Sequence, residues 1–166
     1  HKNGIMNTMV PEPEIPSHQG PDAQSVDPEL DVVTAAVKVP QTLSHMHYWT
    51  VQLTKNASKE EVLEAFGTST RTAFINMSDD LSANNAVKEL MLDLGRPHGD
   101  MYEVAIWEDM LKVEGDELYY AYLVDNQAIV IPETIDAIRA LTGTESDPQK
   151  SITKTNHSLG ITQRFI

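Results

Sequence analysis

A Gly-Asp pair at residues 115–116 constrains the fold more than any other feature of the chain. It lies between two strand-like segments, MLKVE (residues 110–114) and ELYYAYLV (residues 117–124). Two residues of this kind between two strands are typical of a tight hairpin, so the strands are predicted to run antiparallel. A doubly wound nucleotide-binding fold would need regular alternation of strands and helices and a glycine-rich turn, and the sequence has neither.

Four further segments have the residue pattern of a strand. They are DVVTAAVKV (31–39), MHYWTVQLT (46–54), TAFINM (72–77) and YEVAIW (102–107). In the first of them, alternate side chains would form one apolar face, made of Val33, Ala35, Val37 and Val39. The stretch before it, residues 11–21, is rich in proline and is predicted to be an irregular loop.

Four segments are predicted to be helices from their caps and the spacing of their apolar residues. Ser58 and Glu61 form a capping box at the start of the first helix. The third helix is expected to bury Ile135, Ile138 and Leu141, which recur at helical spacing. The expected helices cover residues 58–66, 82–95, 131–143 and 148–161.

Together these elements predict an α+β fold, in which helices on one face cover a mixed, mostly antiparallel sheet. The 166 residues have the size of one domain, which can bury a core without disulfides or metals. No apolar run is long enough to span a bilayer, and a net charge of −13 repels the phosphates of nucleic acid. We therefore expect a soluble, cytoplasmic protein that binds neither membranes nor nucleic acid.

His45 and His47 stand where the second predicted strand begins. On a strand, His45, His47 and Trp49 would share one face. Such a pair could bind zinc together with His18, act as a general base, or only donate hydrogen bonds to backbone carbonyls, and the spacing by itself favours the last use. No metal site is predicted. The chain has no Cys, which excludes a cysteine nucleophile within it.

Four motifs, in this order, resemble the C-terminal catalytic domain of archaeal-type (type II) phosphorylating glyceraldehyde-3-phosphate dehydrogenase. They are PEPEIPSHQGPDAQSV, VKVPQTLSHMH, LGRPHGDMYEVAIWED, and IPETIDAIRA followed by KSITKTN. The resemblance extends from about residue 5 to about residue 161. It implies a homotetrameric enzyme that oxidises glyceraldehyde 3-phosphate to 1,3-bisphosphoglycerate with inorganic phosphate and NAD or NADP.

The resemblance also implies roles for individual residues. His45, the first histidine of TLSHMH, is the general base that takes a proton from the cysteine that attacks the aldehyde. His47 supports the pocket wall. Many family members have a second histidine at position 19 and a glutamine at position 126. The remaining site residues are His18, Gln19 and Gly20 for the substrate, and Asn126 and Asn156 for the cofactor.

The sequence departs from the family in one large respect. In this family a dinucleotide-binding domain and the attacking cysteine precede the region that the chain resembles, and neither occurs in residues 1–166. We therefore expect a catalytic-domain fragment without activity of its own. Two alternatives remain at this stage: another aldehyde-oxidising dehydrogenase with a similar two-domain plan, and a non-catalytic binding or oligomerisation module.

Overall fold

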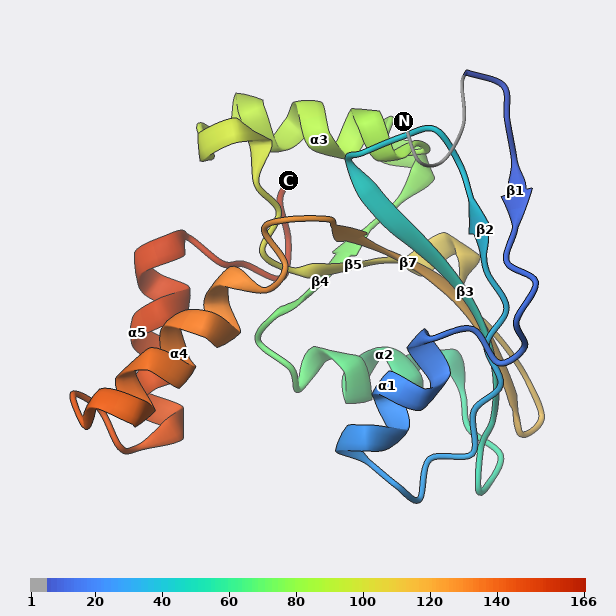
Figure 1. Cartoon of the computed structure of the whole chain (residues 1–166), viewed down its shortest axis with the longest axis horizontal. Helices are drawn as coiled ribbons and strands as arrows, with labels where there is room; N and C mark the ends of the chain where they lie inside the picture. The colour runs from blue at the N-terminus through green and yellow to red at the C-terminus, as the bar shows by residue number, and fades with distance from the viewer. Residues whose placement is uncertain (1–5) are drawn as a thin grey trace. The chain divides into compact units, whose positions relative to one another are not determined.

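The computed structural model describes residues 6–166, and the chain divides between Thr42 and Leu43 into two compact units. The first unit contains two short strands that pair antiparallel, β1 (Val10–Pro11) and β2 (Val37–Lys38), and one helix, α1 (Gln19–Val26). The second unit contains the remaining helices and strands (Figure 1).

The strand predicted over residues 31–39 is confirmed only at β2, Val37–Lys38, and the rest of the segment forms no ladder. Val33, on the predicted apolar face, is 75% exposed. The segment lies beside a stretch with prolines at positions 11, 13 and 16, which have no N–H to donate. Only isolated bonds remain, such as those from the Ser17 N–H to the Thr34 carbonyl (2.8 Å) and from the Glu12 N–H to the Ala36 carbonyl (2.9 Å).

The second unit is built on a sheet of five strands in the order β3-β7-β5-β4, with β6 also paired to β7. Only β4 and β5 are parallel, so the predicted α+β class with a mostly antiparallel sheet is confirmed. The strands are β3 (Ser44–Gln52), β4 (Thr72–Ile75), β5 (Val104–Trp107), β6 (Lys112–Glu114) and β7 (Glu117–Asp125).

The predicted hairpin is confirmed between β6 and β7. Glu114 pairs with Glu117, so Gly115 and Asp116 form the two-residue connection. Gly115 has a φ of 67°, a backbone conformation that favours glycine. β7 also pairs with β3 along their whole length, from Ser44 opposite Asp125 to Gln52 opposite Glu117. β7, the second strand of the predicted hairpin, therefore pairs with three other strands, β3, β5 and β6.

Four longer helices accompany the sheet, and the capping box of the first is confirmed. The Ser58 hydroxyl accepts from the Glu61 N–H (3.1 Å), and the Glu61 carboxylate accepts from the Ser58 N–H (2.7 Å). The helices are α2 (Lys59–Gly67), α3 (Asn84–Asp93), α4 (Ile131–Thr142) and α5 (Pro148–Leu159), and three single 3-10 turns are η1 (Met77–Asp79), η2 (Pro97–Gly99) and η3 (Glu108–Met110).

The core has a part on each face of the sheet. Neighbouring side chains of β7 point to opposite faces: Ala121 and Leu123 pack with α3, whereas Leu118 packs with α2. Figure 1 shows α3 and α2 on opposite sides of the sheet. The prediction that helices cover one face of the sheet is therefore wrong, because β7 carries apolar residues on both faces and α2 covers the second.

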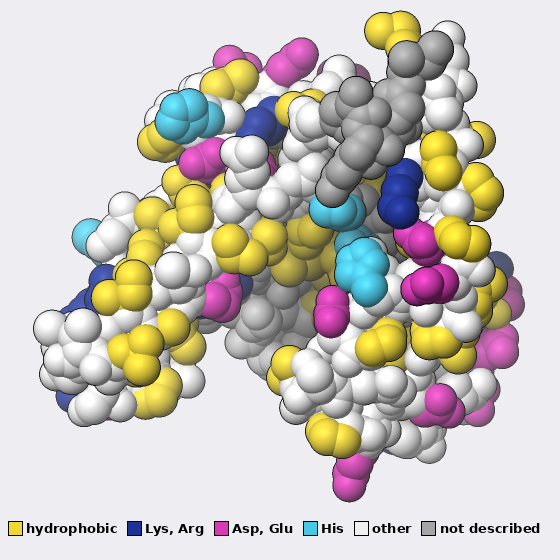
Figure 2. Space-filling model, in the orientation of Figure 1, with side chains coloured by type: hydrophobic (Ala, Val, Ile, Leu, Met, Phe, Trp, Pro, Cys, Tyr) yellow, Lys and Arg dark blue, Asp and Glu magenta, His cyan; other side chains and the backbone are white. Residues whose placement is uncertain are grey.

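The helix α4 does not bury the residues that its spacing predicted. Ile138 is 54% exposed and Leu141 is 87% exposed, so their predicted burial is wrong, and Ile135 is half-buried. Figure 2 shows hydrophobic side chains on the surface formed by α4 and α5. α4 instead turns Asp136 and Arg139 toward α5, where they bond with polar side chains.

Candidate functional site

The start of β3 carries the two histidines of the TLSHMH motif. His45 is exposed and His47 is half-buried, with their ring centroids 6.1 Å apart. From His47 onward, half-buried and exposed side chains alternate along β3: His47 and Trp49 are half-buried, and Tyr48 between these two is exposed. The two imidazoles are therefore neighbours on one strand, and His45 is the more accessible of the two.

His47 has aromatic surroundings that favour its neutral form. It lies opposite Tyr122 of β7, and the two rings stack with centroids 4.8 Å apart and an interplanar angle of 13°. Burial, and then the charge of His45, lowers the pKa of His47. Burial raises the pKa of Tyr122. His47 and Tyr122 consequently form an uncharged wall beside His45 at neutral pH.

Asp125 anchors the opposite strand at the same end of the sheet. Its buried carboxylate accepts from the Lys88 ammonium of α3 (2.8 Å) and from the N–H groups of Gln127 (2.9 Å) and Ala128 (3.0 Å). Burial raises the pKa of Asp125, but the bond from Lys88 and the two backbone bonds outweigh it and lower the pKa. The turn after β7 is thus held to α3 by a charged pair.

Asn126 stands in this anchored turn, at the end of the sheet where His45 lies. Its N–H donates to the Leu43 carbonyl (3.1 Å), which continues the pairing of the two strands beyond Asp125. The Asn84 side chain of α3 donates to the Ser44 hydroxyl (3.1 Å), next to His45. The second unit therefore brings the imidazole of His45 and the carboxamide of Asn126 to one end of the sheet. The residue before each of them, Ser44 or Asp125, bonds with α3 and helps to fix its position.

The loop with His18, Gln19 and Gly20 belongs to the first unit. His18 is exposed at the start of α1, and its side chain makes no capping bond. The Gly20 N–H donates to the Thr34 hydroxyl (3.0 Å), so a bond within the loop already uses the N–H that could hold an anion. A Cβ atom at position 20 would lie 2.9 Å from Thr34 Oγ1, which explains why a glycine stands there.

Asn156 of α5 makes contacts with the segment before β4. Its carbonyl oxygen accepts from Arg71 Nε (3.0 Å), and its NH₂ group donates to the Thr70 hydroxyl (2.8 Å). One N–H of the amide then remains for another acceptor. Sequence reasoning placed Asn156 near the cofactor but gave no sign of its contact with Arg71, since 85 residues separate the two.

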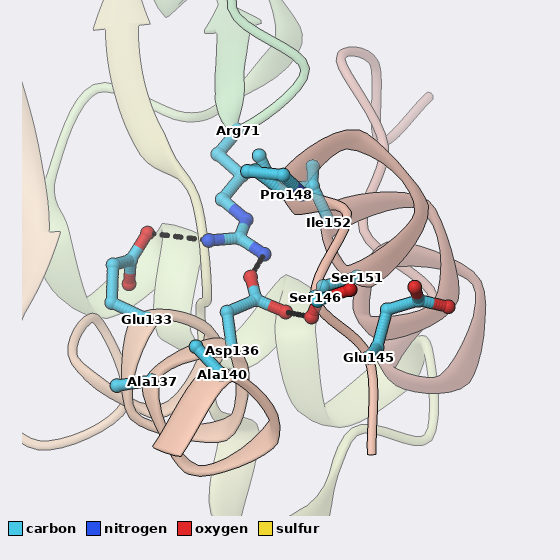
Figure 3. Close-up of a pocket in the computed structure, with 10 residues that line it drawn as sticks. All are labelled: Arg71, Glu133, Asp136, Ala137, Ala140, Glu145, Ser146, Pro148, Ser151 and Ile152. Atoms are coloured by element: carbon cyan, nitrogen blue, oxygen red, sulfur yellow. Dashed lines mark hydrogen bonds and ion pairs between the residues drawn. The ribbon is translucent and has the colours of Figure 1, made fainter. Parts of the chain in front are cut away.

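A pocket with a volume of about 360 Å³ lies between α4 and α5, and Arg71, which bonds with Asn156, is one of the residues that line it (Figure 3). Its charged groups already have partners: Arg71 bonds with Glu133 (2.8 Å) and with Asp136, and Glu145 bonds with Lys154. Asp136 also accepts from the Ser151 and Thr155 hydroxyls, each at 2.6 Å. These groups join α4, α5 and the start of β4, and we assign the pocket a structural role.

Within residues 6–166, no group of three His, Asp or Glu side chains is placed to hold a metal ion. No helix in this range is long and apolar enough to cross a membrane. On the face shown in Figure 2, acidic side chains are scattered over the surface.

Comparison with known proteins gives a family match. Residues 2–110 match the family model described as glyceraldehyde 3-phosphate dehydrogenase, C-terminal domain. Similar curated proteins are the glyceraldehyde-3-phosphate dehydrogenases of Methanopyrus kandleri (42% identical), Methanobrevibacter smithii (40%) and Pyrobaculum calidifontis (45%). Each alignment covers 96% of this chain but only 46%, 48% and 46% of the relative, respectively. The chain thus spans about half the length of these relatives.

Proposed function

The chain belongs to the family of glyceraldehyde 3-phosphate dehydrogenase C-terminal domains, and on this premise we propose that it forms the catalytic domain of such an enzyme. The reaction is oxidation of glyceraldehyde 3-phosphate to 1,3-bisphosphoglycerate, with inorganic phosphate and NAD or NADP. The observation that carries the proposal is the family match, which includes both the loop at residues 17–22 and His45. The attacking cysteine and the dinucleotide-binding domain would be supplied from outside residues 1–166.

His45 is the proposed general base. It first takes the proton of the attacking thiol, so that the thiolate can form a bond to the aldehyde carbon. It gives this proton to the oxyanion that forms, and then takes it back from the hydroxyl of the resulting hemithioacetal, as that carbon loses a hydride to the oxidised cofactor and becomes the thioester carbon. Phosphate displaces the thiolate from the thioester and completes the product. The exposed position of His45 supports this role, because the base must reach a group outside the chain.

Asn126 and Asn156 are the residues that we propose for the cofactor, which supplies the hydride acceptor when it is bound. Asn126 fits a nicotinamide, because the NH₂ group of its side chain can donate to the oxygen of another carboxamide, and it stands at the sheet end of His45. Asn156 can offer only the N–H that Thr70 does not use. The choice between NAD and NADP is not made by these two residues, since the ribose 2′ position is read by the dinucleotide-binding domain.

His18, Gln19 and Gly20 are the proposed substrate contacts. Among them, Gln19 has a side chain that can donate to an oxygen of the substrate, and His18 can add positive charge when it is protonated. Gly20 is assigned by the resemblance of the SHQGPD loop to the substrate-binding loop of the family. A Cβ atom at position 20 would lie 2.9 Å from Thr34 Oγ1, so the close packing of the loop against Thr34 requires a glycine there. We also propose that the complete enzyme is a cytoplasmic homotetramer. The exposed Met46 and Tyr48 on the edge strand β3 support association between subunits.

The test is an assay of the full-length protein that contains this chain. With glyceraldehyde 3-phosphate, phosphate and each cofactor in turn, we expect the absorbance of reduced nicotinamide to rise, and omission of phosphate should prevent sustained turnover. Aspartate semialdehyde replaces the substrate in a parallel reaction, because it distinguishes another aldehyde-oxidising dehydrogenase. Turnover of the semialdehyde alone, or of neither aldehyde, would overturn the proposal.

A further inference from the structure

The Thr34 hydroxyl lies at the centre of a hydrogen-bond network beneath the proposed substrate loop. It donates to the Ser17 carbonyl (2.9 Å) and accepts from the Gly20 N–H (3.0 Å). The Ser17 hydroxyl lies 2.9 Å from the same oxygen, and Ser17 is fully buried, with 0% of its surface exposed. One hydroxyl therefore holds the residues on both sides of Gln19.

The network extends to the side chain of Gln19. The Ser17 hydroxyl donates to Gln19 Oε1 at 2.5 Å. A carboxamide carries its oxygen and its NH₂ group on different sides of one planar carbon. Because the oxygen is bonded to Ser17, the NH₂ group, which can only donate, is left for another partner.

We propose that Thr34 is a positioning residue that, through Ser17, fixes Gln19 as a hydrogen-bond donor to an oxygen of the substrate. This inference rests on the proposed function. Its ligand chemistry is an anionic or carbonyl oxygen, which glyceraldehyde 3-phosphate and inorganic phosphate both offer. Thr34 lies 15 residues after Gln19, outside the SHQGPD motif, and touches no proposed ligand itself.

Space around Gly20 supports the same arrangement. A Cβ atom there would lie 2.9 Å from Thr34 Oγ1 and 3.3 Å from the Pro16 Cβ. The Thr34 hydroxyl can approach the loop backbone this closely only because position 20 has no side chain. The hydroxyl is thus packed against the loop as well as bonded to it.

The experiment compares Thr34→Val with Thr34→Ser in the full-length protein. Valine keeps the shape of threonine and removes the hydroxyl, whereas serine keeps the hydroxyl. We expect Thr34→Val to raise KM for the ligand that Gln19 contacts by about tenfold, the usual effect of losing a hydrogen bond to a charged group, with kcat within about twofold. Thr34→Ser should restore the wild-type KM. KM is measured separately for glyceraldehyde 3-phosphate and for phosphate, and the one that rises identifies the ligand.

A double-mutant cycle links Thr34 to Gln19. Gln19→Glu keeps the oxygen that Ser17 contacts but replaces the donor with a second oxygen, so KM should rise at least as much as in Thr34→Val. If Thr34 acts through Gln19, adding Thr34→Val to Gln19→Glu should raise KM no further. Multiplied effects of the two changes, or equal effects of valine and serine at position 34, would overturn the proposal.

Crystal structures of the two variants separate failure of this inference from failure of the proposed function. If the wild-type protein oxidises no aldehyde, the proposed function fails, but the distance from Gln19 Oε1 to Ser17 Oγ still decides the positioning role. It should stay at hydrogen-bond length in Thr34→Ser and lengthen in Thr34→Val. An unchanged distance in Thr34→Val would refute the role. If Thr34→Val does not fold, Ser17→Ala tests the same link, with the same expected rise in KM.

Discussion

His45 and His47 are two residues apart on one strand, yet their surroundings suit them to different tasks. His45 is exposed, whereas His47 is half-buried and stacked on Tyr122. We expect His45→Asn in the full-length protein to lower the rate of single-turnover hydride transfer by about a hundred- to ten-thousand-fold, the usual range for a lost general base. His47→Asn should lower it much less.

Cofactor affinity is the control for this pair of variants. Both should bind the cofactor as the wild type does, because neither side chain is proposed to contact it. If the His47 variant loses the chemical step and the His45 variant keeps it, the two histidines must exchange roles.

Burial of His47 also predicts a pH dependence of stability. Its folded pKa lies below the ordinary value of 6.5. As pH falls below about 6.5, the unfolded chain binds a proton there more readily than the folded chain does, so the free energy of unfolding should decrease. Urea unfolding at several pH values from about 7.5 to about 5, on both sides of 6.5, measures the decrease in the free energy of unfolding.

The matched variants for this measurement are His47→Gln and His157→Gln. The first removes the buried imidazole and should flatten the decrease toward acid pH. The second removes an exposed imidazole on α5 and should leave the slope as it is. A slope that is the same in all three proteins would show that His47 takes up its proton equally in both states.

How far the sequence predicts the site depends on how local each contact is. The motifs predicted His45 and the loop at residues 17–22 because each lies in a continuous stretch. The contacts that hold them join residues far apart: Lys88 reaches Asp125 across 37 positions, and Thr34 reaches Ser17 across 17. Periodicity and capping patterns describe single elements, so they contain no signal for such pairs.

Among the elements, α4 and α5 are joined by a polar junction around Asp136. Burial raises the pKa of Asp136, but hydrogen bonds from Ser151 and Thr155 and the ion pair with Arg71 outweigh it and lower the pKa from 3.8 to about 2. The folded pKa is the lower one, so the junction stabilises the fold above about pH 4, and the contribution is lost as pH falls toward 2. This lowering of the pKa of Asp136 corresponds to about 2 kcal/mol in the free energy of unfolding at neutral pH.

We therefore expect Asp136→Asn to lower the free energy of unfolding by about 2 kcal/mol at neutral pH, with the difference from wild type shrinking toward pH 2. Chemical denaturation at several pH values measures this. Glu133→Gln is the control, because Glu133 bonds with the same Arg71 but its side chain is 61% exposed. A difference that persists unchanged at pH 2 would mean that the contribution of Asp136 does not depend on the charge of its carboxylate.

The elements that the sequence predicts correctly are those whose pattern is local. The capping box of α2 and the β6–β7 hairpin are local, and the structure confirms both. The strand predicted at residues 31–39 forms only at Val37–Lys38, and the predicted burial of Leu141 is wrong, because each depended on a partner surface. The first lacks donors on its proline-rich neighbour, and α4 meets α5 through Asp136 and Arg139 instead of its apolar side.

At the scale of the whole molecule, the proposed site residues are divided between the two units. Gln19 belongs to the first unit, and His45 and Asn126 belong to the second. The proposed roles of these residues are to bind a ligand or to accept a proton, and none of them can be the nucleophile. With no Cys in its 166 residues, the chain has no thiol to form the covalent intermediate that the proposed reaction requires.

We therefore expect the 166-residue chain by itself to be inactive as a dehydrogenase. A purified sample is mixed with glyceraldehyde 3-phosphate, phosphate and either cofactor, and the absorbance of reduced nicotinamide should stay constant. The full-length protein, assayed at the same molar concentration, is the positive control. His45→Asn in the isolated chain identifies any contaminating enzyme, because a contaminant would be unaffected by it. Turnover that scales with the concentration of the isolated chain and disappears in this variant would contradict the prediction, since His45 would then act with a nucleophile other than cysteine.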